Sequence, residues 1–384
     1  MTTNATFLER NNELFDRFGH LVEDIKGTDA ISTFQEQNKA VVMMDNACRQ
    51  QFNDAKIDYA SMTNKQFIEQ TDTGDIATNI NTTLAMIGKV YPNLITRSLV
   101  SIQPLRQNGG KIYYNDIVRT SDGSSLSTGI HTNRDYANNE EYDPSDPTAI
   151  AQIQMAITST DITTTEKKLL SKVTAEVMQD LMNDHGMSAT SILDSTKYTE
   201  IIREWDRHVL QAMISGATGG SSTFSTAVPS GLSYEDRKYW METLYECFID
   251  VDNQIFKKRY RKTNFIVLGA DEAAFVEKMA GFKTNPIDVT HAIVQSGGRY
   301  EMGTLNSRWK IIVDPFLSGT ILMGYNNPSD WLETSFIFAP YIMSYYSPEF
   351  MNPETFVRSR AILSRCGAQV VQGDLLGTIT VTAS

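Results

Sequence analysis

A chain of 384 residues is long for one hydrophobic core and suggests two or three structural units. With 41% hydrophobic and 21% charged residues, its composition is that of a soluble folded protein, and its apolar runs are too short to span a membrane. The formal net charge of −12 argues against a protein whose main task is to grip phosphate backbones.

The cysteines and the N-terminus indicate the compartment. Cys48, Cys247 and Cys366 lie far apart and are odd in number, so we expect reduced thiols and no disulfide framework or Cys-x-x-Cys metal site. The first residues lack a basic segment followed by an apolar one, so we expect no signal peptide.

Residues 1–75 are predicted to be helical. Apolar residues recur at helical spacing in two stripes, one from Leu14 to Ile25 and one from Phe34 to Met44. Two interpretations stay open at this point: a helical subdomain packed on its own body, or an arm that packs on neighbouring subunits or acts during assembly.

The next segment is predicted to contain a short helix that ends at Pro92 and a strand over Leu99–Ile102. Lys111–Arg119 then reads as an outgoing strand and Ala149–Thr165 as a returning one. The polar connection between these strands has no core pattern, which indicates either function or disorder. Five bulky residues in this region favour contact with a partner surface: Tyr113, Tyr114, Ile130, Tyr136 and Tyr142.

Two helices are predicted next, joined at His185-Gly186. The first is indicated by apolar residues at steps of three and four, namely Leu170, Val173, Val177 and Leu181. The second spans about 191–214, and its apolar stripe is Tyr198, Ile201, Ile202, Trp205, Val209 and Met213. A helix of that size is roughly 35 Å long, which suits a strut across a flat domain.

After Ala217, the small residues around Gly219 and Gly220 predict a flexible connection and a domain boundary. A helix over 234–257 should follow, and it ends in the basic run Lys257–Lys262. This run is typical of a solvated turn, of a subunit contact or of a DNA contact. Strands at 264–268, 309–313 and 320–325 complete the segment, with Gly324 suiting a close backbone approach.

A search for reactive groups finds no catalytic pattern. The histidines form no His-x-His or His-Glu-x-x-His spacing, and no nucleophile elbow or dinucleotide fingerprint is present. Glu204 and His208, four residues apart, could be half of a metal site or a helix-stabilising pair. We therefore predict no enzyme, and neither catalytic, cofactor-binding nor metal-binding residues.

From about residue 70 to residue 384, an ordered set of landmarks resembles the major capsid protein of T-even-type tailed bacteriophages, which has the Hong Kong 97-like capsid fold. The helix with the Glu176–Asp180 step and the long helix with Glu204 and Arg207 belong to this set. The other landmarks include Tyr91-Pro92-Asn93-Leu94, Ile102-Gln103-Pro104-Leu105, Asn264-Phe265-Ile266-Val267, Phe338-Ala339-Pro340-Tyr341 and Pro353-Glu354-Thr355-Phe356. Cys366 departs from the family, which has an aromatic residue there.

The resemblance implies an α+β fold with a helical N-terminal arm over residues 1–75. The peripheral domain would comprise 76–111, 165–232 and 345–384, with a spine helix at about 191–214. An extended loop would span 112–164, and an axial domain 233–344.

The implied function is assembly. Copies would form hexamers and pentamers of an icosahedral phage head that encloses double-stranded DNA without sequence-specific binding, as a virion protein assembled in the host cytoplasm. Portal, scaffold and decoration proteins are the implied partners, and no membrane is involved. Two alternatives are a nanocompartment shell of the same fold with a cargo enzyme and, more remotely, a soluble enzyme.

The family also implies processing and movement. A prohead protease cuts its members after a Glu two residues past Leu or Ile, and Phe67-Ile68-Glu69 only approximates this pattern; we expect the arm to be retained. The precursor shell expands, and Gly186, Gly219 and Gly220 are candidate hinges for that change.

Ile112–Glu166 contains no lysine. Some members of this fold join subunits through a loop lysine condensed with an asparagine, and this chain lacks that nucleophile. We predict that particles boiled in denaturant will run as single chains of 43.0 kDa on a denaturing gel. A ladder of oligomers that survives this treatment would contradict the prediction.

Overall fold

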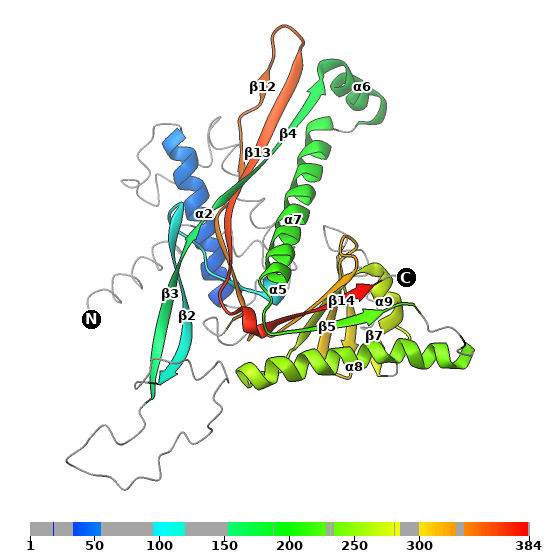
Figure 1. Cartoon of the computed structure of the whole chain (residues 1–384). Coiled ribbons are helices and arrows are strands. Elements are labelled where there is room, and N and C mark those ends of the chain that lie inside the picture. Colours follow the sequence, from blue (N-terminus) through cyan, green and yellow to red (C-terminus); the bar gives the residue numbers. More distant parts are fainter. Residues whose placement is uncertain are drawn as a thin grey trace, which may run out of the picture.

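The structure, a computed structural model, describes residues 18, 34–54, 94, 96–119, 153–186, 188–227, 231, 234–279, 281–284, 299–327 and 334–382. Its frame is two β-sheets joined by one long helix, with a two-stranded hairpin projecting from the body (Figure 1). The structure is therefore of the α+β class.

The long helix α7 spans Ala189–Ser215, close to the predicted 191–214. Ser188 caps it by accepting a hydrogen bond from the Ser191 N–H. The 27 residues make a rod of about 40 Å. The six apolar residues of the predicted stripe are all buried, so this face of the helix packs against the core.

The first sheet has five strands, in which β13 (Val357–Val370) pairs with β4 (Thr165–Thr174) on one edge. On its other edge lie β11 (Phe336–Tyr346) and β12 (Phe350–Met351). The short β1 (Ser101–Ile102) runs parallel to β11, after helix α5 (Thr96–Leu99). The strand predicted over Leu99–Ile102 is therefore correct for Ser101 and Ile102, whereas Leu99 ends helix α5.

The helix predicted from Leu170 begins later than its apolar spacing suggests. Leu170 and Val173 belong to strand β4, which runs antiparallel to β13 along its whole length. Non-local pairing thus overrides a helical pattern in a segment whose threonine and valine also suit a strand. Helix α6 spans Ala175–His185 and ends at Gly186, whose φ of 63° suits glycine.

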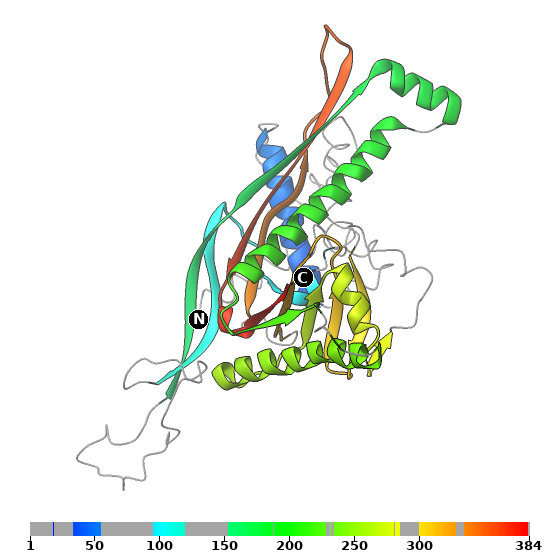
Figure 2. The same cartoon turned by 45° about the vertical axis from the view of Figure 1, so that its right-hand side comes forward.

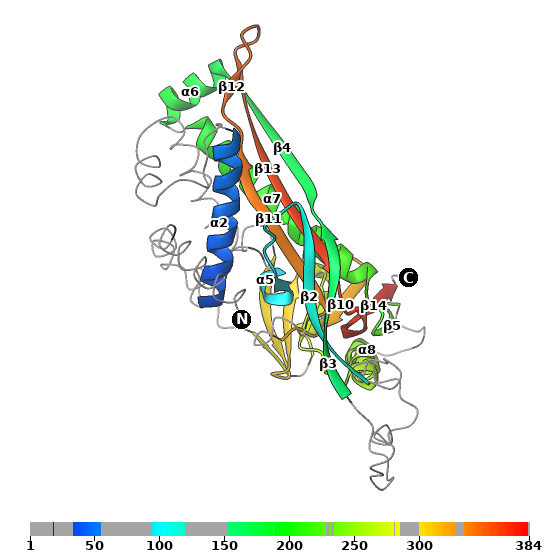
Figure 3. The same ribbon diagram turned by 90° about the vertical axis from the view of Figure 1, so that its left-hand side faces the viewer.

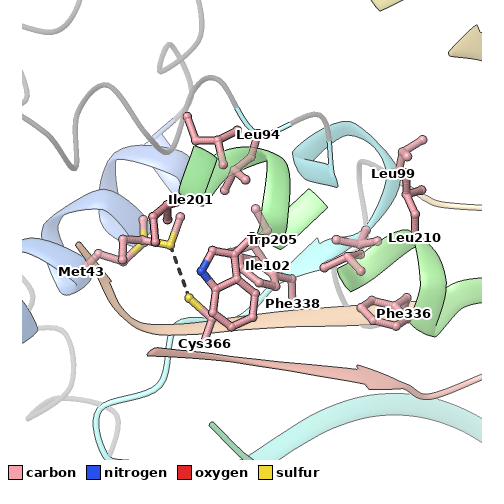
Figure 4. Packing of buried hydrophobic residues seen from close by; sticks show 14 of the residues in the cluster. Met43, Leu94, Leu99, Ile102, Ile201, Trp205, Leu210, Phe336, Phe338 and Cys366 are labelled. Atoms are coloured by element: carbon pink, nitrogen blue, oxygen red, sulfur yellow. Dashed lines mark hydrogen bonds between the residues drawn. The ribbon is translucent and has the colours of Figure 1, made fainter. Parts of the chain in front are cut away.

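Helices α7 and α2 cover one face of this sheet, and together they form the first hydrophobic core (Figures 3 and 4). Helix α2 spans Phe34–Asp54 and buries Val41, Met43 and Met44 in that core. Of the two interpretations of the N-terminal region, α2 fits packing on its own body. Of the first predicted stripe, the structure describes only Phe18, which is buried in the same core.

The second sheet has seven strands in the order β5-β14-β10-β6-β9-β8-β7. Their bounds are β5 Gly220–Ser225, β6 Phe265–Leu268, β7 Phe282–Thr284, β8 Tyr300–Leu305, β9 Trp309–Val313, β10 Thr320–Gly324 and β14 Leu376–Thr382. Helix α8 (Tyr234–Arg259) and the short α9 (Ala270–Val276) pack on it around a second core (Figure 2). The space beside Gly324 is filled by the side chains of Phe265 and Leu376, not by the close backbone approach that we predicted.

The predicted flexible connection after Ala217 is wrong. Gly219 donates its N–H to the Leu376 oxygen at 2.8 Å, and Gly220 begins strand β5, which runs parallel to β14. A Cβ on Gly219 would lie 2.2 Å from the Asp374 oxygen. These small residues permit two backbone segments to cross closely, at the 3₁₀ turn η5 (Gly373–Leu375).

The sheets also depart from the predicted domain limits. Strand β11 falls largely within the predicted axial segment 233–344, yet it pairs in the first sheet. Strands β5 and β14 fall in predicted peripheral segments, yet they extend the second sheet. Strand partners lie far apart in the sequence, so local composition does not reveal which sheet a strand joins.

A buried ion cluster connects the spine helix to the second sheet. Arg299, 1% exposed, lies 3.5 Å from the Asp206 carboxylate of α7 and 2.9 Å from that of Asp314, which follows β9. Two carboxylates share one guanidinium out of contact with water, so losing the cation would leave two buried negative charges.

We predict that Arg299→Met lowers the free energy of unfolding by about 3–5 kcal/mol, because it removes the buried cation that both carboxylates face. Urea denaturation of the soluble subunit measures this loss. Adding Asp206→Asn and Asp314→Asn to Arg299→Met should restore part of the stability. Equal stability of wild type and Arg299→Met would contradict this account of the cluster.

Candidate functional site: surfaces for subunit contact

The clearest projection is the hairpin of β2 (Gly109–Arg119) and β3 (Ile153–Thr163) (Figure 1). The strands pair antiparallel from Gly109–Thr163 to Arg119–Ile153, which makes a ribbon of roughly 35 Å. The predicted outgoing and returning strands are confirmed.

The contact candidates lie on this hairpin and beyond it. Tyr113 and Tyr114 are in β2, opposite Ser159 and Thr158. Ile130, Tyr136 and Tyr142 lie outside the described residues. The structure therefore places two of the five candidates on the projecting ribbon and says nothing of the other three.

The base of the hairpin packs on the body. Ile112 and Ile162 form a small core with Leu105, Ile337 and Ala339 on the face of β11 that points away from α7. Beyond this cluster the strands leave the sheet, as Figure 3 shows. A two-stranded ribbon by itself is marginally stable, so a projecting one favours a second surface to lie on.

The opposite end of the first sheet carries exposed apolar side chains. Met182 on α6 is 61% exposed, Phe350 on β12 is 67% exposed, and Phe356 in the turn before β13 is 60% exposed. In Figure 1 these elements form the end farthest from the hairpin. We call these three residues the tip surface; exposed aromatic and methionine side chains are typical of protein–protein contacts.

A shallow pocket of about 300 Å³ lies beside the tip surface, at the junction of α6 and α7. Its lining is Ala175, Met178, Gln179, Met182, Asn183, Ser188, Ala189 and Arg358. The lining contains one cation and no carboxylate. It suits an inserted side chain of another protein better than a reacting substrate.

The basic run at the end of α8 has partners within the chain. Lys258 donates to the Thr218 oxygen at 2.6 Å, and Arg259 pairs with Asp374 at 3.1 Å. The Lys262 Nζ lies 5.4 Å from the centre of the Phe256 ring. These contacts hold the helix end to the glycine crossing, which favours a structural turn over a DNA contact.

The groups suspected of chemistry do not converge. Glu204 accepts a hydrogen bond from Lys167 of β4 at 3.0 Å, while His208 packs edge-on against Trp205. Burial, followed by the Lys167 charge, lowers the pKa of His208, and Glu204 opposes this shift. Among the described residues, no three His, Cys, Asp or Glu side chains form a group that could hold a metal ion.

The cysteines are free thiols, with Cys48 and Cys366 buried and Cys247 partly exposed. Burial raises the pKa of the Cys366 thiol to about 12, against weaker opposing effects of Ser364, Tyr341 and Lys167. A thiol with that pKa is almost entirely protonated at neutral pH and is a poor nucleophile. Cys366 therefore serves as a core residue.

The described surface thus combines a projecting ribbon, an apolar tip and no converging reactive groups, which defines a subunit built to associate. The sequence profile of the major capsid protein Gp23 family matches residues 114–382. The chain belongs to this family: it is a major capsid protein, a structural component of a bacteriophage virion.

Solved structures give further similarities. The capsid of Myoviridae phage XM1 is 10% identical over 74% of this chain and 89% of that one, with a TM-score of 0.45. The structure from Mycobacterium phage Bobi is 9% identical over 75% of this chain and 90% of that one, with a TM-score of 0.47. The capsid of cyanophage P-SCSP1u is 10% identical over 76% of this chain and 89% of that one, with a TM-score of 0.44. No curated protein matches the sequence.

Sequence reasoning missed the tip surface and the buried cluster of Arg299. Apolar residues of the tip, such as Phe350 and Phe356, do not differ in type from core residues, and only tertiary structure shows their exposure. No sequence pattern around Arg299 predicts a buried ion cluster.

Among the described residues, no helix is long and apolar enough to cross a membrane.

Proposed function

We propose that this major capsid protein assembles into hexamers and pentamers that close a non-covalent icosahedral shell around double-stranded DNA. The observation that carries the proposal is the β2–β3 hairpin, which packs on its own subunit at its base and then projects from the body (Figure 1). A stable interface buries on the order of 1,000 Å² or more, and a ribbon laid across the next subunit offers such an area. Closed symmetry then repeats one contact around the capsomer.

The parts of the subunit take corresponding roles in this proposal. The first sheet with α7 is the peripheral domain and its spine, and the hairpin with residues 120–152 is the extended loop. The second sheet with α8 and α9 is the axial domain, which meets its symmetry mates at the capsomer centre. In this proposal β11 belongs to the peripheral domain, since it pairs with β13, and β5 and β14 belong to the axial domain, since both pair in the second sheet.

Two kinds of contact hold the shell in this proposal. The extended loop, with Tyr113, Tyr114, Ile130, Tyr136 and Tyr142, lies on the neighbouring copy in the same capsomer. The tip surface meets copies of other capsomers. Of the candidate hinges, Gly186 has open space around it, whereas Gly219 and Gly220 lie in the packed crossing. We assign shell expansion to movement at Gly186 ahead of the crossing.

Charge is consistent with the proposed contents. A net charge of −12 disfavours adhesion to DNA, so the shell would contain the genome without gripping it. Portal and scaffold proteins are the further partners of the proposal, with decoration proteins as additional ones. The role is structural, not catalytic.

The test compares two triple variants of the extended loop. Ile130→Ser/Tyr136→Ser/Tyr142→Ser removes the three bulky side chains, and we expect it to abolish shells. The melting temperature of the subunit should stay within about 2 °C, because a contact made between subunits does not stabilise a single chain. Negative-stain microscopy and light scattering measure assembly. The matched control, Ile130→Val/Tyr136→Phe/Tyr142→Phe, should assemble. Normal shells from the serine variant would refute the loop contact.

A further inference from the structure

Asn46 is a buried amide in an apolar stretch of α2. It is 4% exposed and follows the buried Asp45, with Met43 and Met44 before this pair and Ala47 and Cys48 after it. Its Nδ2 donates two hydrogen bonds, to the Leu105 oxygen at 2.7 Å and to the Tyr341 oxygen at 3.0 Å. One side chain of the arm helix thus binds two segments that are far from it in sequence.

Both acceptors need a partner because of where they lie in the first sheet. The pairing of β11 with β13 is irregular between Pro340 and Ile342, at Tyr341. Leu105 follows β1 on the outer edge of β11, where its N–H donates to the Pro340 oxygen. Buried carbonyls without a partner are costly, and the Asn46 amide supplies the donors that the sheet does not.

Leu105 is also part of the hairpin base. It packs with Ile112 and Ile162, and its Cδ2 atom comes within 3.1 Å of the place where a Cβ on Gly110 would lie. The Thr164 N–H closes the base by donating to the Asn108 oxygen at 3.2 Å. The acceptor of the Asn46 hydrogen bond, Leu105, therefore lies four residues before strand β2 begins.

We propose that Asn46 is a positioning residue, through which the arm helix α2 fixes the direction in which the β2–β3 hairpin leaves the subunit. Apolar neighbours such as Met43 and Ala47 tolerate sliding or rotation of the helix, and the buried Asp45 pairs with Arg49 of the same helix at 2.9 Å. The two hydrogen bonds from the Asn46 amide, by contrast, have direction and join α2 to the first sheet in one register. Docking of α2 adds a directional link between Leu105 and Tyr341 to the hydrogen bond that the Leu105 N–H donates to the Pro340 oxygen.

This inference rests on the proposed function, because the direction of the extended loop determines how it meets the next subunit. It also gives the arm a regulatory role. Cleavage after Glu69 would release the chain segment that carries Asn46 and would remove both hydrogen bonds at once. Retention of the arm keeps the hairpin in a single orientation.

The first experiment is hydrogen exchange on the soluble full-length subunit. Asn46→Asp replaces both donors with a carboxylate that faces two carbonyl oxygens, and Asn46→Ser is a milder variant for the case that the first does not fold. We expect exchange at 108–112 and 160–164 to rise about tenfold or more, with unchanged exchange in β6, β9 and β10. The control Met43→Ala removes apolar contact from the same helix and should leave the hairpin base protected.

Unchanged protection at the hairpin base in both Asn46 variants would overturn the proposal, as would an equal rise in both sheets. The second readout is the particle: Asn46→Ser should give shells of mixed diameter where Met43→Ala gives uniform ones. If the wild-type chain forms no shells, the proposed function fails, while hydrogen exchange still decides whether α2 and the hairpin are coupled.

Discussion

The packing of Trp205 between the spine helix and the first sheet is the interaction on which the rest of the subunit depends. Its indole N–H donates to the Ser364 hydroxyl at 2.7 Å, and its ring meets Phe338 edge-on (Figure 4). A buried indole needs a partner for its N–H, and Ser364 lies on β13, the strand with which β4, β11 and β12 all pair. One side chain therefore sets the position of α7 along the central strand.

Ion pairs at two places along the helix extend this alignment. Near its beginning, Asp194 pairs with Arg360 of β13 at 2.7 Å and with the buried Lys197 at 2.7 Å. Further along, Asp206 faces Arg299, the residue before β8 of the second sheet. The spine helix is thus bound to both sheets. At the glycine crossing, the segment that follows the spine helix also binds the turn η5, which connects β13 of the first sheet to β14 of the second.

The sequence predicts those parts of the fold that have a local signal. The apolar stripe around Trp205 predicts α7, and the strands on either side of the polar stretch predict the hairpin. The start of α6 was misplaced because Leu170 and Val173 match a helical period, yet they pair with β13. Gly219 was misread because a close crossing and a flexible linker both require small residues.

The association surfaces were predicted less well than the fold. Tyr113 and Tyr114 stand out because they occur in a segment without a core pattern, and the structure places them on the projecting ribbon. The tip surface has no such signal. Asn46 does have a sequence signal, because it is a polar residue within the largely apolar run VVMMDNAC. Only the structure shows that its partners are Leu105 and Tyr341.

The central claim is that this chain finishes burying its apolar surface against copies of itself. An electron-microscopy reconstruction of purified particles tests it most directly. The account predicts a closed shell in which the β2–β3 hairpin lies on a neighbouring subunit and Phe350 is covered by another copy. Isolated globular subunits, or a shell whose hairpins fold back on their own bodies, would contradict it.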